Sequence, residues 1–450
     1  MTKALFHFIV VALTFTAPVA IAQNAVEAEL VGNPFKERWP DAPYARNIWT
    51  MTVHDGRLYF GGGNSANTGP SQNAGPVPII SYDKDGFRED FTVEEEQITV
   101  FYARDGALYV PGHDTTESWA FGNLYRLDEY GWAKLRTVQH GLHVYDMHAY
   151  KGRLIAAGGA YNQPLDGWIS DNDGASWRSA ALLDNPAFSS EDNPSGAFTR
   201  RFGGGYYGRL YTLFELGGRL YASADAPLEP KGARIDPMRA TLFVYDDDEG
   251  GFAPAAFHPA TVPAGYRDAF TAAGVDLFPG VAPGAEDGRL QMPVVPRDLI
   301  VGAETIYIGA WMHNDHQHRP FGLFAASSPE DARRIALPEG FQPYDLLTHD
   351  GAAYALVNRR IAHNRFEIGV MTANAGAPGA WRMAARFEAP SFARAFAVYD
   401  GDVYFGLGTE IDDPHAEGPD SEAAWAGDLS AAAGNVLRVR GSAVFEPARR

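Results

Sequence analysis

Residues 55–60 read DGRLYF, a glycine-containing turn followed by a short apolar strand that includes tyrosine. An apolar stretch, residues 48–53, precedes the turn. Strand, Asp-Gly turn and strand together form the sequence pattern of a β-hairpin. The pattern returns along the chain, with one weaker copy at residues 303–308; the others lie at residues 105–110, 151–155, 217–221, 350–354 and 400–405.

A third apolar strand usually follows each hairpin, as at residues 78–82, 122–126, 241–245, 322–324 and 435–439. A fourth strand is indicated at residues 133–136 and 381–383. Four antiparallel strands, repeated about seven times, predict an all-β fold: a seven-bladed β-propeller with four-stranded antiparallel blades, forming a single domain over residues 23–450. A pair of β-sandwiches or a β-helix is the competing interpretation. Helical repeats are disfavoured because the apolar period is two.

One short segment, residues 170–177, reads SDNDGASW and resembles the Asp box of sialidase-like propellers. Asn172 and Ser176 are its departures from that pattern. The resemblance implies a turn between outer strands that is locked by side-chain hydrogen bonds and packed by Trp177. It indicates fold and carries no catalysis.

The composition excludes several classes of function. Hydrophobic residues make up 46% of the chain and charged residues 21%, which is typical of a globular protein and excludes disorder as the main state. The formal net charge of -19 provides no global attraction for nucleic acid or an anionic membrane, so we expect neither as a partner. The absence of cysteine excludes disulfides, thiolate metal sites and cysteine nucleophiles.

The first 22 residues have the pattern of a secretory signal peptide. Lys3 is followed by an apolar run to about Ile21, and the run ends in the small-x-small pattern of residues 20–22. A membrane anchor or a buried N-terminal helix is the alternative, but the run is short for a membrane span. We therefore expect cleavage after Ala22 and a secreted or periplasmic bacterial protein.

The propeller geometry predicts where functional side chains gather. Residues just before the first strand and just after the second strand of each blade should converge on a central funnel. The residues at these positions are rich in arginine, histidine and tyrosine, which favours an anionic ligand such as a uronate, sulfate or sialate. Alternatively, the arginines pair with acidic loops and the tyrosines pack between blades. The substrate-binding candidates are Arg201, Tyr206, Asn162, Arg297, Tyr344, Arg359 and Arg394.

Two histidines of neighbouring blades are candidates for acid–base chemistry, because histidine titrates near neutral pH. His113 follows the second strand of one blade, and His143 begins the first strand of the next. Strict alternation from His143 would place Tyr145 and Met147 on its face of the strand, with Val144 and Asp146 on the other.

Residues 313–318 form the densest group of potential metal ligands in the chain. Histidine and carboxylate side chains bind divalent ions, so His313, Asp315, His316 and His318 form a candidate site for a structural zinc or calcium ion. Their spacing matches no known metal motif, and a polar funnel loop is the alternative. We expect catalysis by the protein to require no cofactor.

Two segments resemble the bacterial propeller polysaccharide lyases, particularly the ulvan lyases. They are PGHD (residues 111–114), continued by ESWxxGNxY (residues 117–125), and HVYDM (residues 143–147). The resemblance implies β-elimination on a sulfated, uronate-containing polysaccharide, with His113 and His143 in the acid–base roles. It further implies Tyr207 or Tyr206 beside them and Arg200 or Arg201 as the neutraliser of the uronate carboxylate. We expect a monomer whose partner is this anionic polysaccharide.

Two other classes remain open. The first is a glycoside hydrolase. A sialidase-like enzyme suits the Asp box and the arginine-rich funnel, but sialidases carry several Asp boxes and this sequence has a single degenerate one. An inverting or retaining glycosidase would need two carboxylates at a defined separation, and the sequence offers candidates without selecting a pair: Asp114, Asp225, Asp298 and Asp315. A non-catalytic propeller that binds glycan or protein at the same mouth is the second, since propellers host many functions.

Overall fold

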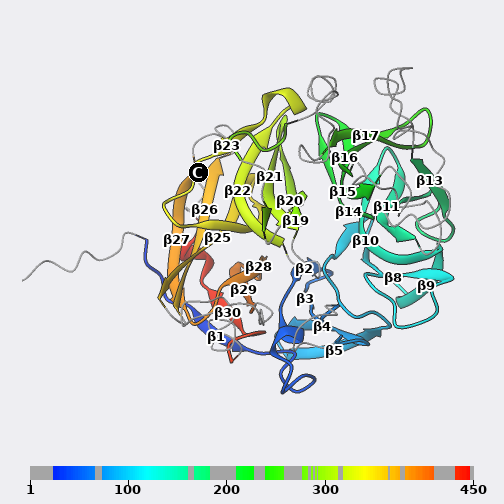
Figure 1. Ribbon diagram of the computed structural model, residues 1–450. Coiled ribbons are helices and arrows are strands. Elements are labelled where there is room, and N and C mark those ends of the chain that lie inside the picture. Colours follow the sequence, from blue (N-terminus) through cyan, green and yellow to red (C-terminus); the bar gives the residue numbers. More distant parts are fainter. Residues whose placement is uncertain are drawn as a thin grey trace, which may run out of the picture.

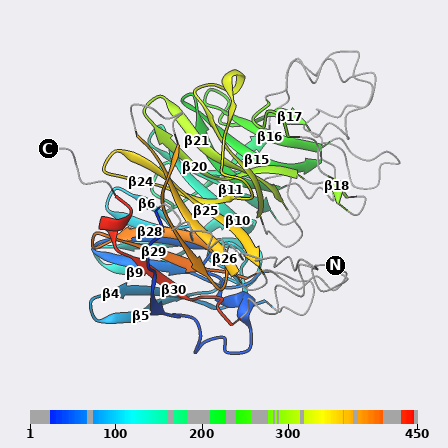
Figure 2. The ribbon, with the colours of Figure 1, turned by 90° about the vertical axis from the view of Figure 1, so that its left-hand side faces the viewer.

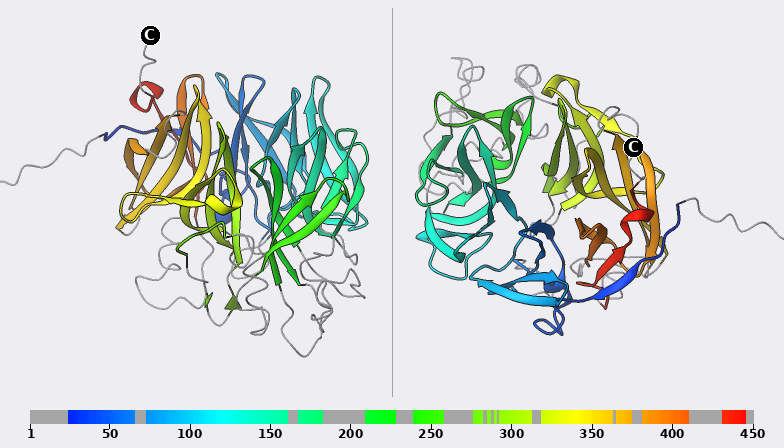
Figure 3. Two further views of the ribbon diagram at one scale, coloured as in Figure 1. Left: turned by 90° about the horizontal axis from the view of Figure 1, so that it is seen from above. Right: turned by 180° about the vertical axis from the view of Figure 1, so that it is seen from behind.

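The computed structural model describes residues 24–65, 73–160, 167–182, 209–227, 239–257, 276–281, 285–286, 289–290, 292–312, 318–362, 365–374, 381–409 and 431–445. Within these residues the strands form seven four-stranded antiparallel blades arranged in a ring, so the predicted β-propeller is confirmed (Figure 1). Figures 2 and 3 show the same ring from the side and from behind.

Blades 1 to 6 are meanders whose strands follow one another along the chain. Blade 1 contains β2 (Thr50–His54), β3 (Arg57–Gly61), β4 (Val77–Asp83) and β5 (Gly86–Val93). Blade 2 contains β6 (Tyr102–Arg104), β7 (Ala107–Pro111), β8 (Phe121–Asp128) and β9 (Gly131–Gln139). Blade 3 contains β10 (Gly141–Tyr150), β11 (Arg153–Ala160), β12 (Gly167–Ser170) and β13 (Arg178–Leu182). Blade 4 contains β14 (Arg209–Leu216), β15 (Arg219–Pro227), β16 (Arg239–Asp246) and β17 (Gly251–Phe257).

Blade 5 contains β20 (Met292–Val301), β21 (Glu304–Met312), β22 (His318–Ala326) and β23 (Arg333–Ile335). Blade 6 contains β24 (Gln342–His349), β25 (Ala352–Ala362), β26 (Arg365–Asn374) and β27 (Arg382–Ala389). Blade 7 contains β28 (Ala393–Tyr399), β29 (Asp402–Leu407), β30 (Val436–Val439) and, as its outer strand, β1 (Glu29–Gly32). The remaining described elements are β18 (Ala285–Glu286), β19 (Arg289–Leu290) and the short 3₁₀ helices η1 (Pro43–Arg46), η5 (Pro329–Asp331) and η6 (Gly441–Ala443). None of the helices in the described ranges is long and apolar enough to cross a bilayer.

The Asp-Gly turns join the first and second strands of the blades. Asp55 and Gly56 have φ angles of 46° and 69°, and the turns at residues 105–106, 350–351 and 400–401 also have positive φ at both positions. Positive φ at both central residues is the signature of the type I′ turn, which matches the twist of a hairpin. First strands of successive blades contact one another, as β10 does β14 and β24 does β28, so these strands surround the axis.

Two pairings connect blades beyond the simple meander. β1 pairs antiparallel with β30, so the described N-terminal strand completes the last blade. β13 pairs in parallel with β17, which joins blades 3 and 4 into one eight-stranded sheet.

The hydrophobic core lies between blades. Between blades 2 and 3, for example, Tyr109 and Leu124 pack in one cluster with Val144 and the fully buried Trp168. Burying a large apolar side chain of this kind contributes roughly 1.5–3 kcal/mol. Interfaces of this type hold each blade at a fixed position relative to the next.

The Asp-box turn has the predicted structure. It connects the outer strands β12 and β13, and Ser170 Oγ accepts hydrogen bonds from the backbone N–H groups of Asn172 and Gly174. Asn172 Oδ1 accepts one from the N–H of Ser176, and Trp177 is buried. The two departures from the usual box thus preserve its hydrogen bonding.

Candidate functional site

His113 and His143 lie together at the boundary between blades 2 and 3. The N–H of Val144 donates to the carbonyl of Gly112 over 2.9 Å, which holds the start of β10 beside the end of β7. The ring of His143 also forms a hydrogen bond to the backbone of His113. Both histidine side chains are buried.

A β-bulge decides which neighbours His143 has. The register between β10 and β11 shifts between Val144 and Asp146, which makes Tyr145 the extra residue of the bulge. Val144 and Met147 therefore pack in the same core cluster, and the prediction from strict alternation that Met147 shares a face with His143 is wrong. Tyr145 does lie beside His143, with ring centroids 5.1 Å apart and an interplanar angle of 11°.

The ring stack continues into blade 4. Tyr145 stacks on Tyr211, with centroids 5.4 Å apart, and the guanidinium of Arg209 lies 6.0 Å from the centre of the Tyr145 ring. Arg209 also hydrogen-bonds to Tyr211. The ring of His113 also packs against Tyr145 in an edge-to-face arrangement, with ring centroids 5.0 Å apart. We call this group, together with Asp114, the histidine–tyrosine cluster.

Asp114 stands behind His143. Its Oδ2 lies 3.4 Å from His143 Nδ1, and its side chain is mostly buried. Burial and the charge of Glu96 raise the pKa of Asp114 to about 7, although Arg209 opposes the shift. The carboxyl therefore changes charge near neutral pH, next to an imidazole.

Burial and a nearby cation keep the histidines neutral. Desolvation, supported by the charge of Arg209, lowers the pKa of His113 to about 3 and lowers that of His143 well below its usual value. Burial raises the pKa of Tyr145 well above its usual value, with Arg209 opposing. The cluster thus holds neutral imidazoles, a protonated phenol and a guanidinium in one place.

Both ring nitrogens of His113 face protein hydroxyls. Nε2 lies 3.2 Å from Ser65 Oγ, and Nδ1 lies 3.1 Å from Thr99 Oγ1. A proton would therefore reach or leave this ring through a neighbouring hydroxyl.

A second group, which we call the arginine cluster, consists of Arg297, Arg394 and His318. Burial and the charges of Arg297, Arg394 and His113 lower the pKa of His318 to about 3, so this group lies within electrostatic range of the first. Arg394 stacks on Trp49 at 4.4 Å from the ring centre.

The donors of both arginines are directed largely at the protein. Arg297 Nε faces Asp345 Oδ1 at 3.3 Å, and its Nη2 donates to the carbonyls of Trp49 and Thr99. Arg297 therefore links blade 5 to blades 1, 2 and 6. Arg394 donates from Nε to Asn47 Oδ1 and from Nη2 to the carbonyl of Thr409. Their role in substrate binding stays a prediction, beside this structural one.

The other described candidates, Tyr344 and Arg359, belong to blade 6, whereas the histidine–tyrosine cluster is built from blades 2, 3 and 4. Tyr344 packs on Phe392 with centroids 5.3 Å apart. Arg359 pairs with Glu367, donates to the Glu339 carbonyl and lies over Phe341. Substrate binding by either residue stays a prediction.

Several predicted site residues lie outside the described part of the chain: Asn162, Arg200, Arg201, Tyr206, Tyr207, His313, Asp315 and His316. The proposed signal peptide, residues 1–22, does so too. Of the candidate metal ligands only His318 is described, and among the described residues no group of three histidine or carboxylate side chains is arranged to hold a metal ion.

Three members of the cluster were not singled out from the sequence. Arg209 and Tyr211 lie at the start of β14, two and four residues beyond Tyr207, one of the tyrosines predicted for that blade. The rule that funnel residues lie just before the first strand and just after the second strand identified the correct blade. It did not include residues within the first strand, where Arg209 and Tyr211 lie. Tyr145 was expected beside His143, but period-two alternation gave it no chemical role.

No family model and no curated protein sequence matches the chain. Solved structures that resemble it include the endo-arabinase of Bacteroides thetaiotaomicron, at 12% identity and a TM-score of 0.30 over 65% of this chain and 92% of that one. A GH43 β-1,3-galactosidase gives 12% identity and a TM-score of 0.33 over 67% and 95% of the two chains. Raptor of Chaetomium thermophilum gives 11% identity and a TM-score of 0.41 over 94% and 29%. At these values the likenesses do not bear on what the chain does.

Proposed function

We propose that the chain is a secreted polysaccharide lyase that cleaves a sulfated, uronate-containing polysaccharide of the ulvan type by β-elimination. The observation that carries the proposal is the stack of His143, Tyr145 and Tyr211 with Arg209 against it. These are the side-chain types that such an elimination requires: a base, an acid and a cation for the carboxylate.

The reaction removes the proton on C5 of the uronate, which is barely acidic while the neighbouring carboxylate keeps its charge. Arg209 would pair with this carboxylate and stabilise the enolate-like transition state. Arg200 and Arg201, predicted for the same role, precede Arg209 along the chain.

His143 would take the C5 proton, because its neutral imidazole has a lone pair to accept it. The C–H electron pair then forms the C4=C5 double bond, and the C4–O bond breaks. Tyr145, which burial keeps protonated, would donate its proton to the leaving oxygen. The anionic substrate itself favours protonation of His143 once bound.

His113 remains a second candidate for proton transfer, through the hydroxyls of Ser65 or Thr99. Tyr207 and Tyr206 remain candidates beside it. The proposed reaction needs no nucleophile and no cofactor.

The purified protein should be incubated with ulvan and other uronate polysaccharides while ultraviolet absorbance of the unsaturated product is followed. Growth of the signal supports the lyase. His143→Ala should abolish it, whereas His54→Ala, at the turn end of β2, should not. No signal on any uronate polysaccharide, or full activity of His143→Ala with a native circular dichroism spectrum, would contradict the proposal.

Asp114 favours one alternative, a glycoside hydrolase. A carboxyl whose pKa is about 7 can act as a general acid at neutral pH, and Glu96 supplies a second carboxylate nearby. New reducing ends without ultraviolet absorbance would identify this activity. Binding without either product would identify a glycan-binding propeller.

A further inference from the structure

Two large aromatic side chains are exposed at one end of blade 2. Trp119 and Phe121 retain 45% and 39% of their accessible surface, whereas Tyr125 of the same strand is fully buried. Trp119 follows His113 by six residues, in the same connection between β7 and β8. The connection thus carries a buried histidine of the candidate site at one end and exposed aromatic rings at the other.

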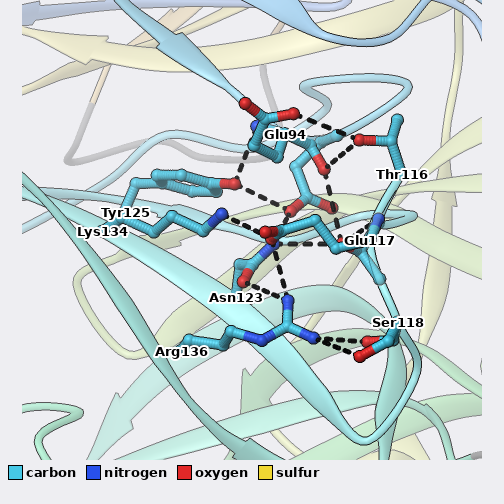
Figure 4. A network of polar contacts seen from close by, with 10 residues as sticks. Glu94, Thr116, Glu117, Ser118, Asn123, Tyr125, Lys134 and Arg136 are labelled. Atoms are coloured by element: carbon cyan, nitrogen blue, oxygen red, sulfur yellow. Dashed lines mark hydrogen bonds and ion pairs between the residues drawn. The ribbon is translucent and has the colours of Figure 1, made fainter.

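The connection is held firmly in place, as Figure 4 shows. Arg136 donates from Nη2 to the carbonyl and hydroxyl oxygens of Ser118, the residue just before Trp119. Glu117 Oε2 accepts from Arg136 at 2.8 Å and from Lys134. The exposed indole of Trp119 therefore follows a segment whose position is fixed by hydrogen bonds and ion pairs.

The buried carboxyl group of Glu95 also stabilises this connection through hydrogen bonds. Glu95 Oε1 accepts hydrogen bonds from Asn123 Nδ2 at 2.6 Å and from the Tyr125 hydroxyl at 3.0 Å. The same Asn123 amide donates to Thr115 Oγ1 at 3.1 Å. The network ties the connection to both β8 and the segment after β5.

Two cationic side chains, Lys134 and Arg136, belong to the network that holds the connection, and both pair with the carboxylate of Glu117. The exposed His140 lies at the same end, because its N–H donates to the carbonyl of Ala120. Aromatic faces beside cations suit a sugar ring that carries anionic groups.

We propose that Trp119 and Phe121, with Lys134 and Arg136, form an outer subsite that binds a sugar unit of the anionic polysaccharide away from the bond that is cleaved. The proposal rests on the proposed function for the identity of the ligand. It assigns the outer subsite to binding, with no part in proton transfer.

The test uses ulvan as the probe and dextran as a neutral control, with binding measured by affinity gel electrophoresis and cleavage by ultraviolet absorbance. Trp119→Ala should weaken ulvan binding about tenfold, the equivalent of ~1.4 kcal/mol. Its KM on the polymer should rise while kcat changes little. Phe121→Ala should have a smaller effect in the same direction.

Tyr130→Ala is the matched control. Tyr130 is 89% exposed and lies in the turn at the opposite end of β8 and β9. It should bind and cleave as the wild type does. The circular dichroism spectrum of each variant should be native.

The outcomes separate the two proposals. Weaker ulvan binding by Trp119→Ala supports the outer subsite, whether or not the wild type produces an ultraviolet signal. If the wild type produces no such signal, the proposed lyase activity is refuted and the outer subsite is not. Wild-type binding by Trp119→Ala, in a protein that cleaves ulvan, overturns the outer subsite alone. A wild-type dimer that Trp119→Ala converts to a monomer would assign the pair to a contact between copies and also overturn it.

Discussion

Asp114 Oδ2 lies 3.4 Å from His143 Nδ1, across the boundary between blades 2 and 3. An ionised carboxylate at this nitrogen fixes the orientation of the imidazole and stabilises the imidazolium that forms when it accepts a proton. Asp114 is therefore placed to act on the chemistry through His143.

Asp114→Asn should lower kcat about tenfold or more, since acid–base catalysis contributes roughly a hundredfold or more. The pKa of Asp114 is raised to about 7, so its carboxylate form predominates only above that pH. Wild-type kcat should accordingly rise as the pH increases through 7, and this rise should be missing in Asp114→Asn. A kcat profile from pH 5 to 9 measures both. Asp85→Asn, in the exposed turn after β4, is the control, and a variant profile that matches the wild type would refute the role.

Arg209→Ala should reduce kcat/KM about 100-fold to 1,000-fold, because in the proposed elimination Arg209 is the cation that stabilises the charge of the transition state. Arg209→Lys should recover part of the loss, since lysine keeps the charge but lacks the planar fork. Steady-state kinetics on ulvan, with circular dichroism to verify folding, decide the question. Full activity of a folded Arg209→Ala would show that the carboxylate is neutralised elsewhere.

Glu95 should make the protein less stable as the pH rises. Burial, with a contribution from Asp114, raises the pKa of Glu95 to about 8 despite hydrogen bonds from Asn123 and Tyr125. The folded protein keeps this proton up to about pH 8, while the unfolded chain releases it near the ordinary value. The free energy of unfolding should therefore fall between about pH 5 and pH 8, by up to about 1.4 kcal/mol per pH unit from this group.

Glu95→Gln should flatten this dependence, because the amide cannot ionise and still offers Oε1 to Asn123 and Tyr125. Urea unfolding at half-unit steps of pH gives the slope. Glu37→Gln, at an exposed position, should keep the wild-type slope. Equal slopes for the wild type and Glu95→Gln would exclude the buried proton.

Asp146 and Asp345 connect neighbouring blades in the same way. Each follows a bulge in a first strand and accepts an N–H from the first strand of the next blade, from Leu213 and Phe396 respectively. Asp146→Ala leaves the N–H groups of Leu213 and Met147 without this acceptor, which should cost about 2–5 kcal/mol.

Asp345→Ala should cost more, because it also removes the carboxylate that faces Arg297. Urea unfolding compares the two variants with Asp85→Ala, which should remain within about 0.5 kcal/mol of the wild type. A smaller loss for Asp345→Ala than for Asp146→Ala would contradict this interpretation.

The repeat of turn and strand predicted the fold because its signals are local. Asp55 and Gly56 adopt positive φ, as a type I′ turn requires, and the Asp-Gly pairs at residues 105–106, 350–351 and 400–401 do the same. The strand that completes the last blade was not predicted, because the pairing of Leu30 with Leu437 spans nearly the whole chain and leaves no local pattern.

The candidate site was predicted in part. His113 and His143 lie together as the blade geometry indicated, because their position depends only on where two strands begin and end. The place of Tyr145 depends on a bulge, which adds one residue and breaks the alternation used to assign faces. Arg209 needed the position at which β14 begins, and element boundaries are the least certain part of a sequence-based prediction.

The strand at residues 29–32 finds its partner at residues 436–439. During synthesis, residues 29–32 are therefore made long before their partner strand, and the ring of blades can close only after almost all of the polypeptide has been made. Forming this pair brings together segments that are nearly the whole chain apart, and such long-range closure is entropically costly and slow. Removing residues 29–32 should consequently leave an open edge on the final blade and loosen the seam that keeps all the blades in one closed circle.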